Sequence, residues 1–428
     1  MQILVIAHQW VRWVVLLAGI IALINLIIKI MTNARDQDLD RRLITIFQRT
    51  LEVQTALGLI LLVRAVIVDD PRLSRIFLHS LIGIIGVGVL FAGRKRETRW
   101  QQKSKSRNRL IITSIALIFI LGGMFLITTA SSTTFQPISV LEGHQDAVRS
   151  VVFSPDSQIL ASGSFDKTIR LWNISDGTLI NTLEGNNEAI RGVAFSPDGS
   201  LLASVSFDQR LKIWTIPEGN LVHDIKAHTA SINKVLFLKD GYTIITASLD
   251  NTIRYWDVNN GELIKELSDG HTGGILSIAS SPDDRFLASG GIDYSVRVHN
   301  ADGDLMPFFG THANWVYDVA YSPDGATLAS SSTDTTVELW DVDNGENLGT
   351  LVGHEGAVQT LAFSPDSKLL ASGSGDSTIK IWKLDTKQLL TTLNQHNKGV
   401  LSITFSPDGK WFASGSADQT VLLWKLTP

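Results

Sequence analysis

The stretch GHEGAVQTLAFSPDSKLLASGSGDSTIKIW, residues 353–382, decides the fold. It begins with Gly-His, ends with Trp382, and contains short runs in which apolar and polar residues alternate. Alternation with a period of two predicts β-strands. Ser364-Pro365-Asp366-Ser367, between two such runs, suits a type I turn because proline presets φ. The stretch therefore predicts a small antiparallel sheet.

This pattern recurs seven times after Pro137, at steps of 41 to 43 residues. The copies start at His144, Asn186, His228, His271, His312, His354 and His396. They finish at Trp172, Trp214, Trp256, His299, Trp340, Trp382 and Trp424. A repeat of this length with several short strands is typical of a propeller blade. Four strands per copy and seven copies predict an all-β, seven-bladed propeller over residues 138–428.

The residues of these repeats resemble the WD40 family. Gly353-His354, Trp256-Asp257 and Trp340-Asp341 carry the resemblance, which covers about 290 of the 428 residues. It implies a propeller that closes by mixing its two ends, so that Ile138–Leu141 completes the seventh blade. This closure would remove two exposed sheet edges.

The resemblance also implies a polar quartet in each blade. The matching residues are His144, Ser162, Asp166 and Trp172 in blade one, and His354, Ser372, Asp376 and Trp382 in blade six. A histidine ring can bond a carboxylate and a hydroxyl at once, while the indole adds a donor. A catalytic triad is the alternative interpretation, but seven active sites are implausible, so we expect seven copies of a structural network. Asn186 and His299 depart from the quartet, and we expect looser networks in their blades.

Binding residues follow from the same resemblance, which implies that three positions per blade face one rim. The positions that favour partner binding there are Arg149, Phe165, Arg191, Phe207, Trp315 and Tyr317. Arginine and aromatic residues dominate the energetics of protein interfaces. The alternative is that Phe165 and Phe207 only cover the seam between two blades.

The first 130 residues have a different character. Four apolar runs approach the length that a transmembrane helix needs: Ile3–Met31, Ile46–Val68, Ile76–Gly93 and Leu110–Ala130. They predict a membrane α-helical bundle of four transmembrane helices over 1–130, followed by a linker at 131–137. Eight basic residues between Arg94 and Arg109 predict that this loop is cytoplasmic. The cell membrane is then crossed several times, the lipid bilayer is a partner, and the propeller lies on the non-cytoplasmic side.

His8 and His79 are the two histidines of this segment. The predicted topology places both near the outer end of a helix, where two neutral imidazoles can hold a haem b iron axially. The residues His8-Gln9-Trp10-Val11-Arg12-Trp13 and Leu78-His79-Ser80 resemble small bacterial four-helix membrane proteins of cytochrome b-like type. The alternative interpretation is a pair of interfacial histidines.

Composition narrows the classes of function. The chain has no cysteine, which excludes thiol nucleophiles and thiolate metal sites. After Ala130 it has 20 basic and 35 acidic residues, so nucleic acid is not an expected partner. No catalytic set stands apart from the repeated quartet. The sequence thus predicts a non-catalytic, membrane-anchored WD40 scaffold that binds a protein or peptide on the rim. An electron-transfer module with haem between His8 and His79 is the alternative.

Overall fold

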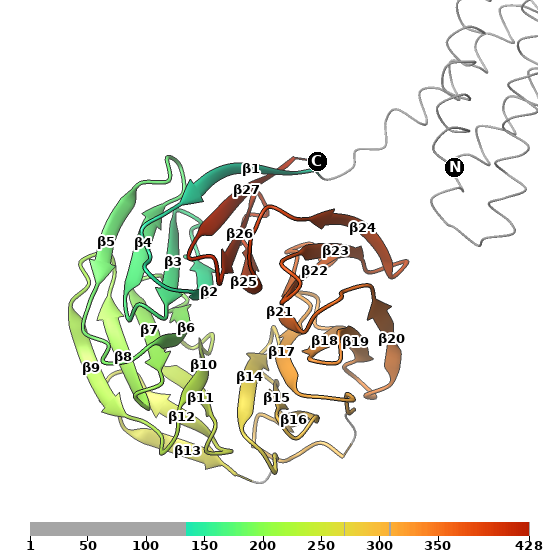
Figure 1. Ribbon diagram of the computed structural model, residues 1–428. Coiled ribbons are helices and arrows are strands. Elements are labelled where there is room, and N and C mark those ends of the chain that lie inside the picture. The colour runs from blue at the N-terminus through green and yellow to red at the C-terminus, as the bar shows by residue number, and fades with distance from the viewer. Residues whose placement is uncertain (1–133, 269, 308–309, 428) are drawn as a thin grey trace, which may run out of the picture. The chain divides into compact units, whose positions relative to one another are not determined.

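The computed structural model describes residues 134–268, 270–307 and 310–427, which belong to the compact unit Thr133–Pro428. All of its regular elements there are β-strands, and they form seven antiparallel sheets arranged in a ring (Figure 1). The innermost strands of neighbouring sheets contact each other around the whole ring, and the last contacts the first. The seven-bladed propeller predicted from the repeats is confirmed.

Each sheet is one blade, and its strands follow one another from the axis outward. Blades one to three are formed by β2 (Val148–Phe153), β3 (Ile159–Ser164), β4 (Ile169–Asn173) and β5 (Leu179–Leu183); by β6 (Ile190–Phe195), β7 (Leu201–Ser206), β8 (Arg210–Thr215) and β9 (Leu221–Lys226); and by β10 (Ile232–Phe237), β11 (Thr243–Ser248), β12 (Ile253–Asp257) and β13 (Leu263–Leu267). Blade four is formed by β14 (Ile275–Ser280), β15 (Phe286–Gly291) and β16 (Val296–Asn300). Blades five to seven are formed by β17 (Val316–Tyr321), β18 (Thr327–Ser332), β19 (Thr336–Asp341) and β20 (Asn347–Val352); by β21 (Val358–Phe363), β22 (Leu369–Ser374), β23 (Ile379–Lys383) and β24 (Gln388–Leu393); and by β25 (Val400–Phe405), β26 (Trp411–Ser416), β27 (Val421–Thr427) and β1 (Thr134–Leu141).

Strand β1 closes the ring. It pairs antiparallel with β27, so that Thr134 lies opposite Thr427 and Leu141 lies opposite Val421. The predicted completion of blade seven by the first strand is confirmed. The strand starts at Thr134 rather than at Ile138, within the segment 131–137 that was expected to be a linker. Phe135 accounts for the extra length, because its ring packs edge-on against Phe412 with centroids 5.7 Å apart.

Among the described residues blade four has three strands, one fewer than the repeat predicts. Its outer edge carries an isolated bridge between His299 and Leu305 and a bond from the Met306 amide to the Val298 carbonyl at 2.8 Å. A second isolated bridge joins Ser295 and Thr311, and the Val296 amide donates to the Gly310 carbonyl at 2.9 Å. Residues 308–309, between the two bridges, lie outside the described residues. The fourth strand predicted for this blade is thus represented in the described residues only by these bridges.

The core lies between neighbouring blades. Leu171 and Leu183 of blade one pack with Ile190 and Trp214 of blade two in a single buried cluster, and similar clusters recur around the ring. Burying one such side chain stabilises the fold by about 1.5 to 3 kcal/mol. Because each cluster takes residues from two sheets, no blade has a core of its own.

Hydroxyl groups also join the innermost strands. The third residue of such a strand accepts the amide proton of the fourth residue in the next blade. These bonds are Val193 to Ser150 at 3.2 Å, Ile403 to Thr360 at 3.2 Å and Val151 to Ser402 at 3.0 Å. A buried amide without an acceptor would destabilise the fold by about 1 to 3 kcal/mol. The hydroxyls thus stabilise the contact between successive blades near the axis.

The predicted membrane architecture is not what the structure shows. The four predicted helices and the two histidines, His8 and His79, lie outside the described residues. Within 134–268, 270–307 and 310–427 no helix is long and apolar enough to cross a bilayer, because these residues form strands of five to eight residues. For the described residues the predicted fold class, a four-helix membrane bundle followed by a propeller, is corrected to an all-β seven-bladed propeller. The predicted location, a multi-pass membrane protein with an outward-facing propeller, is corrected on the same finding.

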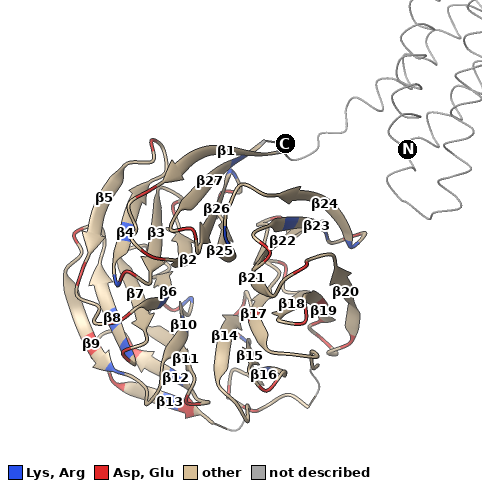
Figure 2. Cartoon of the chain, viewed as in Figure 1, with Lys and Arg blue, Asp and Glu red and all other residues tan. Residues whose placement is uncertain are grey.

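Charged residues are distributed unevenly between the turns and the strands. Figure 2 shows that acidic residues lie largely in the turns between strands, whereas most strand segments carry no charge. Turn residues such as Asp156 bond the turn itself, since its carboxylate accepts the hydroxyl proton of Ser154 and the amide proton of Gln158 at 3.0 Å. Much of the acidic excess therefore serves the turns.

Candidate functional site

The polar quartet forms a continuous chain of hydrogen bonds in blade six. His354 Nδ1 lies 2.9 Å from Asp376 Oδ2, and His354 Nε2 lies 2.8 Å from Ser372 Oγ. Trp382 Nε1 donates to the same Ser372 oxygen at 2.8 Å. With Nδ1 protonated, the histidine donates to the carboxylate and accepts from the serine hydroxyl. Both ring nitrogens, the hydroxyl and the indole N–H of the quartet then have a partner.

Blade one repeats this arrangement. His144 lies 2.7 Å from Asp166 and 2.8 Å from Ser162, and Trp172 donates to Ser162 at 2.8 Å. The hydroxyl is fully buried in both blades, since Ser162 and Ser372 have no exposed surface. A substrate cannot reach such an oxygen. The geometry therefore supports a structural network rather than a nucleophile.

Asp376 is held as a carboxylate by its neighbours. Burial by itself would raise its pKa, but hydrogen bonds from Thr378, the Glu355 amide and His354 outweigh burial and lower the pKa to about 2. Burial lowers the pKa of His354, against the opposing effect of Asp376. The quartet is thus built for a charged aspartate and a neutral histidine.

Blade two departs from the pattern. Asn186 stands in the place of the histidine, and its Oδ1 lies 3.5 Å from Ser204 Oγ. Its Nδ2 has no hydrogen-bond partner among the described residues. Asp208 instead bonds the hydroxyl of Ser206 and the amide of Arg210. This blade has the looser network that we expected. In blade four His271, Ser289 and Asp293 are bonded as elsewhere, and His299 is buried in the place of the tryptophan.

The six predicted binding residues lie at one end of the blades, in two groups. The Phe165 amide bonds the Ala147 carbonyl at 2.9 Å, which places the β3–β4 turn beside the start of β2. The Phe207 amide donates to the Ala189 carbonyl in the same way, and the Thr333 amide donates to the Trp315 carbonyl. We call this end the rim.

The first group is the arginine–phenylalanine cluster, made of Arg149, Phe165, Arg191 and Phe207 on blades one and two. The rings of Phe165 and Phe207 meet edge to face, with centroids 5.9 Å apart. The guanidinium of Arg191 lies over the Phe207 ring, 5.0 Å from its centroid. Phe207 remains 41% exposed, so it does more than cover the seam between the blades.

The second group is the tryptophan–tyrosine pair of blade five. The rings of Trp315 and Tyr317 meet edge to face at 6.4 Å, and Trp315 is 43% exposed. No contact between this pair and the arginine–phenylalanine cluster is found among the described residues. The structure thus places the six residues on one rim in two groups, and Tyr317 of the second group acts electrostatically on both arginines of the first.

The arginines are strongly perturbed. Burial and then the charge of Arg149 lower the pKa of Arg191 to about 9, against the opposing effect of Tyr317. Burial likewise lowers the pKa of Arg149, against the effects of Asp318 and Tyr317. Groups with perturbed pKa values gather at functional sites more often than elsewhere.

Sequence reasoning missed an ion pair on the innermost strands. Lys234 Nζ of blade three lies 3.0 Å from Asp318 Oδ1 of blade five. Asp318 also accepts the hydroxyl proton of Ser277 at 2.6 Å and the amide proton of Leu361 at 2.9 Å. One carboxylate therefore joins blades three, four, five and six. Asp318 was detectable, since the other repeats have serine, threonine, glycine or lysine at its position.

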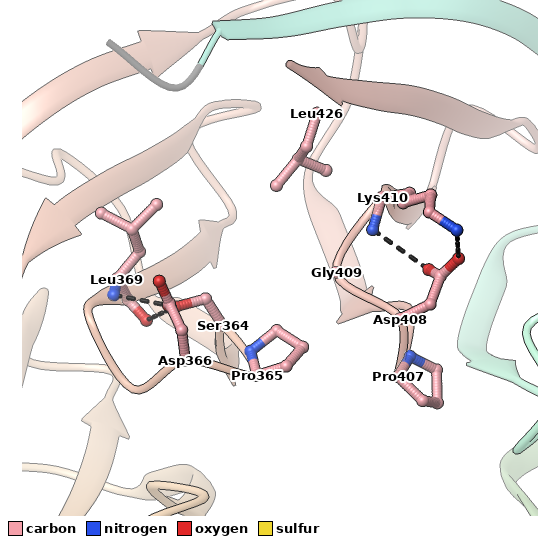
Figure 3. Close-up of a pocket in the computed structure, with 9 residues that line it drawn as sticks. All are labelled: Ser364, Pro365, Asp366, Leu369, Pro407, Asp408, Gly409, Lys410 and Leu426. Atoms are coloured by element: carbon pink, nitrogen blue, oxygen red, sulfur yellow. Dashed lines mark hydrogen bonds and ion pairs between the residues drawn. The ribbon is translucent and has the colours of Figure 1, made fainter. Parts of the chain in front are cut away.

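A hollow of about 480 Å³ lies at the opposite end of blades six and seven (Figure 3). The turns Ser364–Asp366 and Pro407–Lys410 line it together with Leu426. Its polar groups bond within their own turns, as Ser364 does to Asp366 at 2.7 Å and Lys410 to Asp408 at 3.0 Å. These contacts are those of the turns, and the hollow presents no unpartnered polar group. Among the described residues no cluster of histidines and acids suits a metal ion.

Comparison with known proteins shows which protein family the repeats match. The family described as WD domain, G-beta repeat, matches seven segments of the chain: 135–173, 177–215, 219–257, 261–300, 303–341, 345–383 and 387–425. Six of the segments contain the last strand of one blade and three strands of the next, and 303–341 contains the bridged outer edge of blade four and three strands of blade five. This is the offset that the closure by β1 requires.

Individual relatives match over short stretches. The chain is 46% identical over 59 residues to Ribosome assembly protein 4 of Saccharomyces cerevisiae, which is 14% of this chain and 11% of that protein. It is 49% identical over 49 residues to the Notchless protein homolog of Arabidopsis thaliana, which is 11% of this chain and 10% of that one. WD repeat-containing protein 75 of Mus musculus is 41% identical over 66 residues, 15% of this chain and 8% of the relative. The matches thus span about a tenth of the relatives' length.

Proposed function

Because the chain belongs to the WD40 family, whose propellers typically serve as non-catalytic platforms for protein interaction, we propose that it is a scaffold that captures a protein or peptide partner on its rim. The observation that carries the proposal is the arginine–phenylalanine cluster. It combines exposed aromatic surface with two arginines, the residue types in which interface binding energy concentrates. The tryptophan–tyrosine pair supplies a second anchor on the same rim.

The burial of the quartet hydroxyls supports a non-catalytic role. A Ser-His-Asp arrangement is present in blades one and six, but its serine has no exposed surface. The rim is the part of the propeller where aromatic side chains are exposed in groups. Binding is therefore the activity that the described residues support best.

Quantitative affinity capture with the full chain tests the proposal. Phe207→Ala and Trp315→Ala remove the two exposed aromatic anchors, and we expect each to reduce the amount of a captured partner about tenfold or more. Arg285→Ala is the matched control, since Arg285 is an exposed residue in the β14–β15 turn at the opposite end of its blade. Capture that falls equally in all three variants, or in none, contradicts binding on the rim. Circular dichroism confirms that each variant keeps its fold.

A further inference from the structure

Two arginines on the rim form no ion pair among the described residues, although the charge of Asp318 acts to raise the pKa of Arg149 against the effect of burial. Arg149 and Arg191 occupy the same position in β2 and β6, the innermost strands of adjacent blades. Among the described residues neither guanidinium lies within 4 Å of a carboxylate, whereas Arg210, Arg254 and Arg285 each form an ion pair. Arg170 and Arg297 form no ion pair among the described residues either, so Arg149 and Arg191 are distinguished by their equivalent places on two innermost strands that contact each other. The propeller around them has 15 more acidic than basic residues.

The Arg191 guanidinium is held in place on one side only. Its Nε and Nη2 donate to Asn233 Oδ1 at 3.1 and 3.0 Å. The orientation of this amide is fixed in turn, because Asn233 Nδ2 donates to the Ile275 carbonyl at 2.7 Å. Nη1 is left without an acceptor among the described residues. A preordered guanidinium loses little freedom when it binds an anion.

Arg149 is also positioned and also incomplete. Its Nη1 donates to the Leu401 carbonyl of blade seven at 2.6 Å. Its Nε and Nη2 have no acceptor among the described residues. Neutral acceptors orient the two arginines, which lie on adjacent innermost strands, and the charge of Arg149 lowers the pKa of Arg191. An anion placed between them would relieve this repulsion.

The surroundings of the two arginines limit the kind of anion. Phe207 lies beneath the Arg191 guanidinium, and Phe165 meets Phe207 edge to face. An occupant therefore meets planar donors beside an apolar surface. A carboxylate matches the planar donors of a guanidinium through its two oxygens. The acidic excess of the propeller disfavours a polyanion such as nucleic acid, since its further charges would be repelled.

From this arrangement we propose that the arginine–phenylalanine cluster binds the carboxylate of an aspartate or glutamate in an extended segment of the partner, with a neighbouring apolar side chain of that segment on Phe165 and Phe207. The inference rests on the proposed function and adds the chemistry of the partner to it.

Selection from a peptide library tests the inference. The library consists of short peptides with random flanks and a central residue that is glutamate, glutamine or phosphoserine, and the probe is the full chain. We expect glutamate to be enriched over glutamine by about tenfold, which corresponds to about 1.4 kcal/mol. The double variant Arg149→Met with Arg191→Met should abolish this preference, while the apolar preference at the flanks persists. Arg285→Met is the control and should keep both preferences.

Each outcome separates this inference from the proposed function. A phosphoserine preference above that for glutamate overturns the carboxylate assignment. Equal retention of glutamate and glutamine peptides, still sensitive to Phe207→Ala, overturns the inference and leaves rim binding intact. Retention that no rim variant changes contradicts the proposed function itself. The double variant Arg149→Lys with Arg191→Lys keeps the charge but loses the planar donors, and an undiminished glutamate preference in it would contradict recognition through the guanidinium geometry.

Discussion

Blades two and six are built from the same repeat, but their polar networks differ at one position. In blade six His354 connects a carboxylate to the serine that the tryptophan indole also bonds. In blade two Asn186 reaches only the serine, at 3.5 Å, and Asp208 bonds its own turn and, more weakly, the Asn187 amide at 3.4 Å. The Trp214 indole still donates to Ser204 at 2.9 Å. The comparison teaches that the strands and the indole bond form without the histidine, and that the histidine adds the link from the sheet to the turn aspartate.

The two blades also differ on their outer strands. Lys212 in β8 is buried, and its Nζ lies 2.7 Å from Asp224 Oδ2 in β9. Lys380 occupies the same position of blade six, where its partner across the strands is Thr392 at 3.3 Å. Asp224 also pairs with Arg210. Blade two thus carries an ionic network on its outer strands in the place of a complete quartet.

The largest effect is expected from removing the turn aspartate. Asp376→Ala leaves His354, the Glu355 amide and both donors of Thr378 without their acceptor, and we expect it to lower the free energy of unfolding by about 3 kcal/mol. Asp208→Ala in blade two removes bonds within its turn and one long bond from the Asn187 amide, and should cost about 1 kcal/mol. Urea unfolding of the full chain measures both. Equal losses in the two variants would remove the distinction between the blades.

Acid should open blade six before blade two. Asp376 and His354 both have a pKa lowered in the folded state, so their contributions to stability are complete above their unfolded pKa values and are lost as the pH falls through the folded ones. The histidine contribution begins to fall below about pH 6.5, and that of the aspartate falls below about pH 4. Hydrogen exchange by mass spectrometry, corrected for the intrinsic rate, should show greater loss of protection in β21–β24 than in β6–β9. The same loss in both blades would contradict the assignment.

Restoring the histidine should strengthen blade two. Asn186→His places an imidazole ring beside Ser204. In blade six the corresponding histidine also bonds the turn aspartate, so we expect the new ring to bond Asp208. We expect a gain of about 1 kcal/mol, since a buried amide nitrogen without a partner is replaced by a bonded ring. Thermal unfolding measures the gain, and His354→Asn is the reciprocal control. A loss of stability in Asn186→His would show that blade two has repacked around asparagine.

The smallest effect concerns the outer lysines. Lys212→Met leaves Asp224 with Arg210 alone and should cost about 1 kcal/mol, whereas Lys380→Met removes one exposed contact and should change stability by less than about 0.5 kcal/mol. Denaturant unfolding compares the two. If Lys380→Met costs as much as Lys212→Met, the ionic network is not a feature particular to blade two.

The sequence predicts the propeller well, because each repeat contains its own strands and turns. The alternation of apolar residues, the Pro-Asp turns and the repeat length are local signals, and they lead to the number of blades and to the closure by β1. The isolated bridges at the outer edge of blade four have no comparable local signal. The predicted membrane bundle rested on hydropathy and on the placement of basic residues. The described residues form strands only and contain no helix that could cross a bilayer.

Long-range contacts were harder to predict. Lys234 and Asp318 are 84 residues apart in the sequence. They meet across blade four, because both lie on innermost strands. The donation from Arg191 to Asn233 likewise joins neighbouring blades through side chains. The family resemblance predicts which positions face the rim. Whether the charge of a side chain is neutralised there depends on its neighbours in the fold. Whether the six predicted residues bind a partner stays a prediction.

A pulling force would find the weakest point of the ring at blade seven. Because Thr134 lies opposite Thr427, tension between the chain that enters β1 and the end of β27 loads their hydrogen bonds one after another, as a zipper opens, and not all together. Each such bond contributes only about 1 kcal/mol net. Once β1 has peeled away, blade seven keeps three strands, as blade four has from the outset. The seam that completes the ring is therefore also the place where low tension would open it.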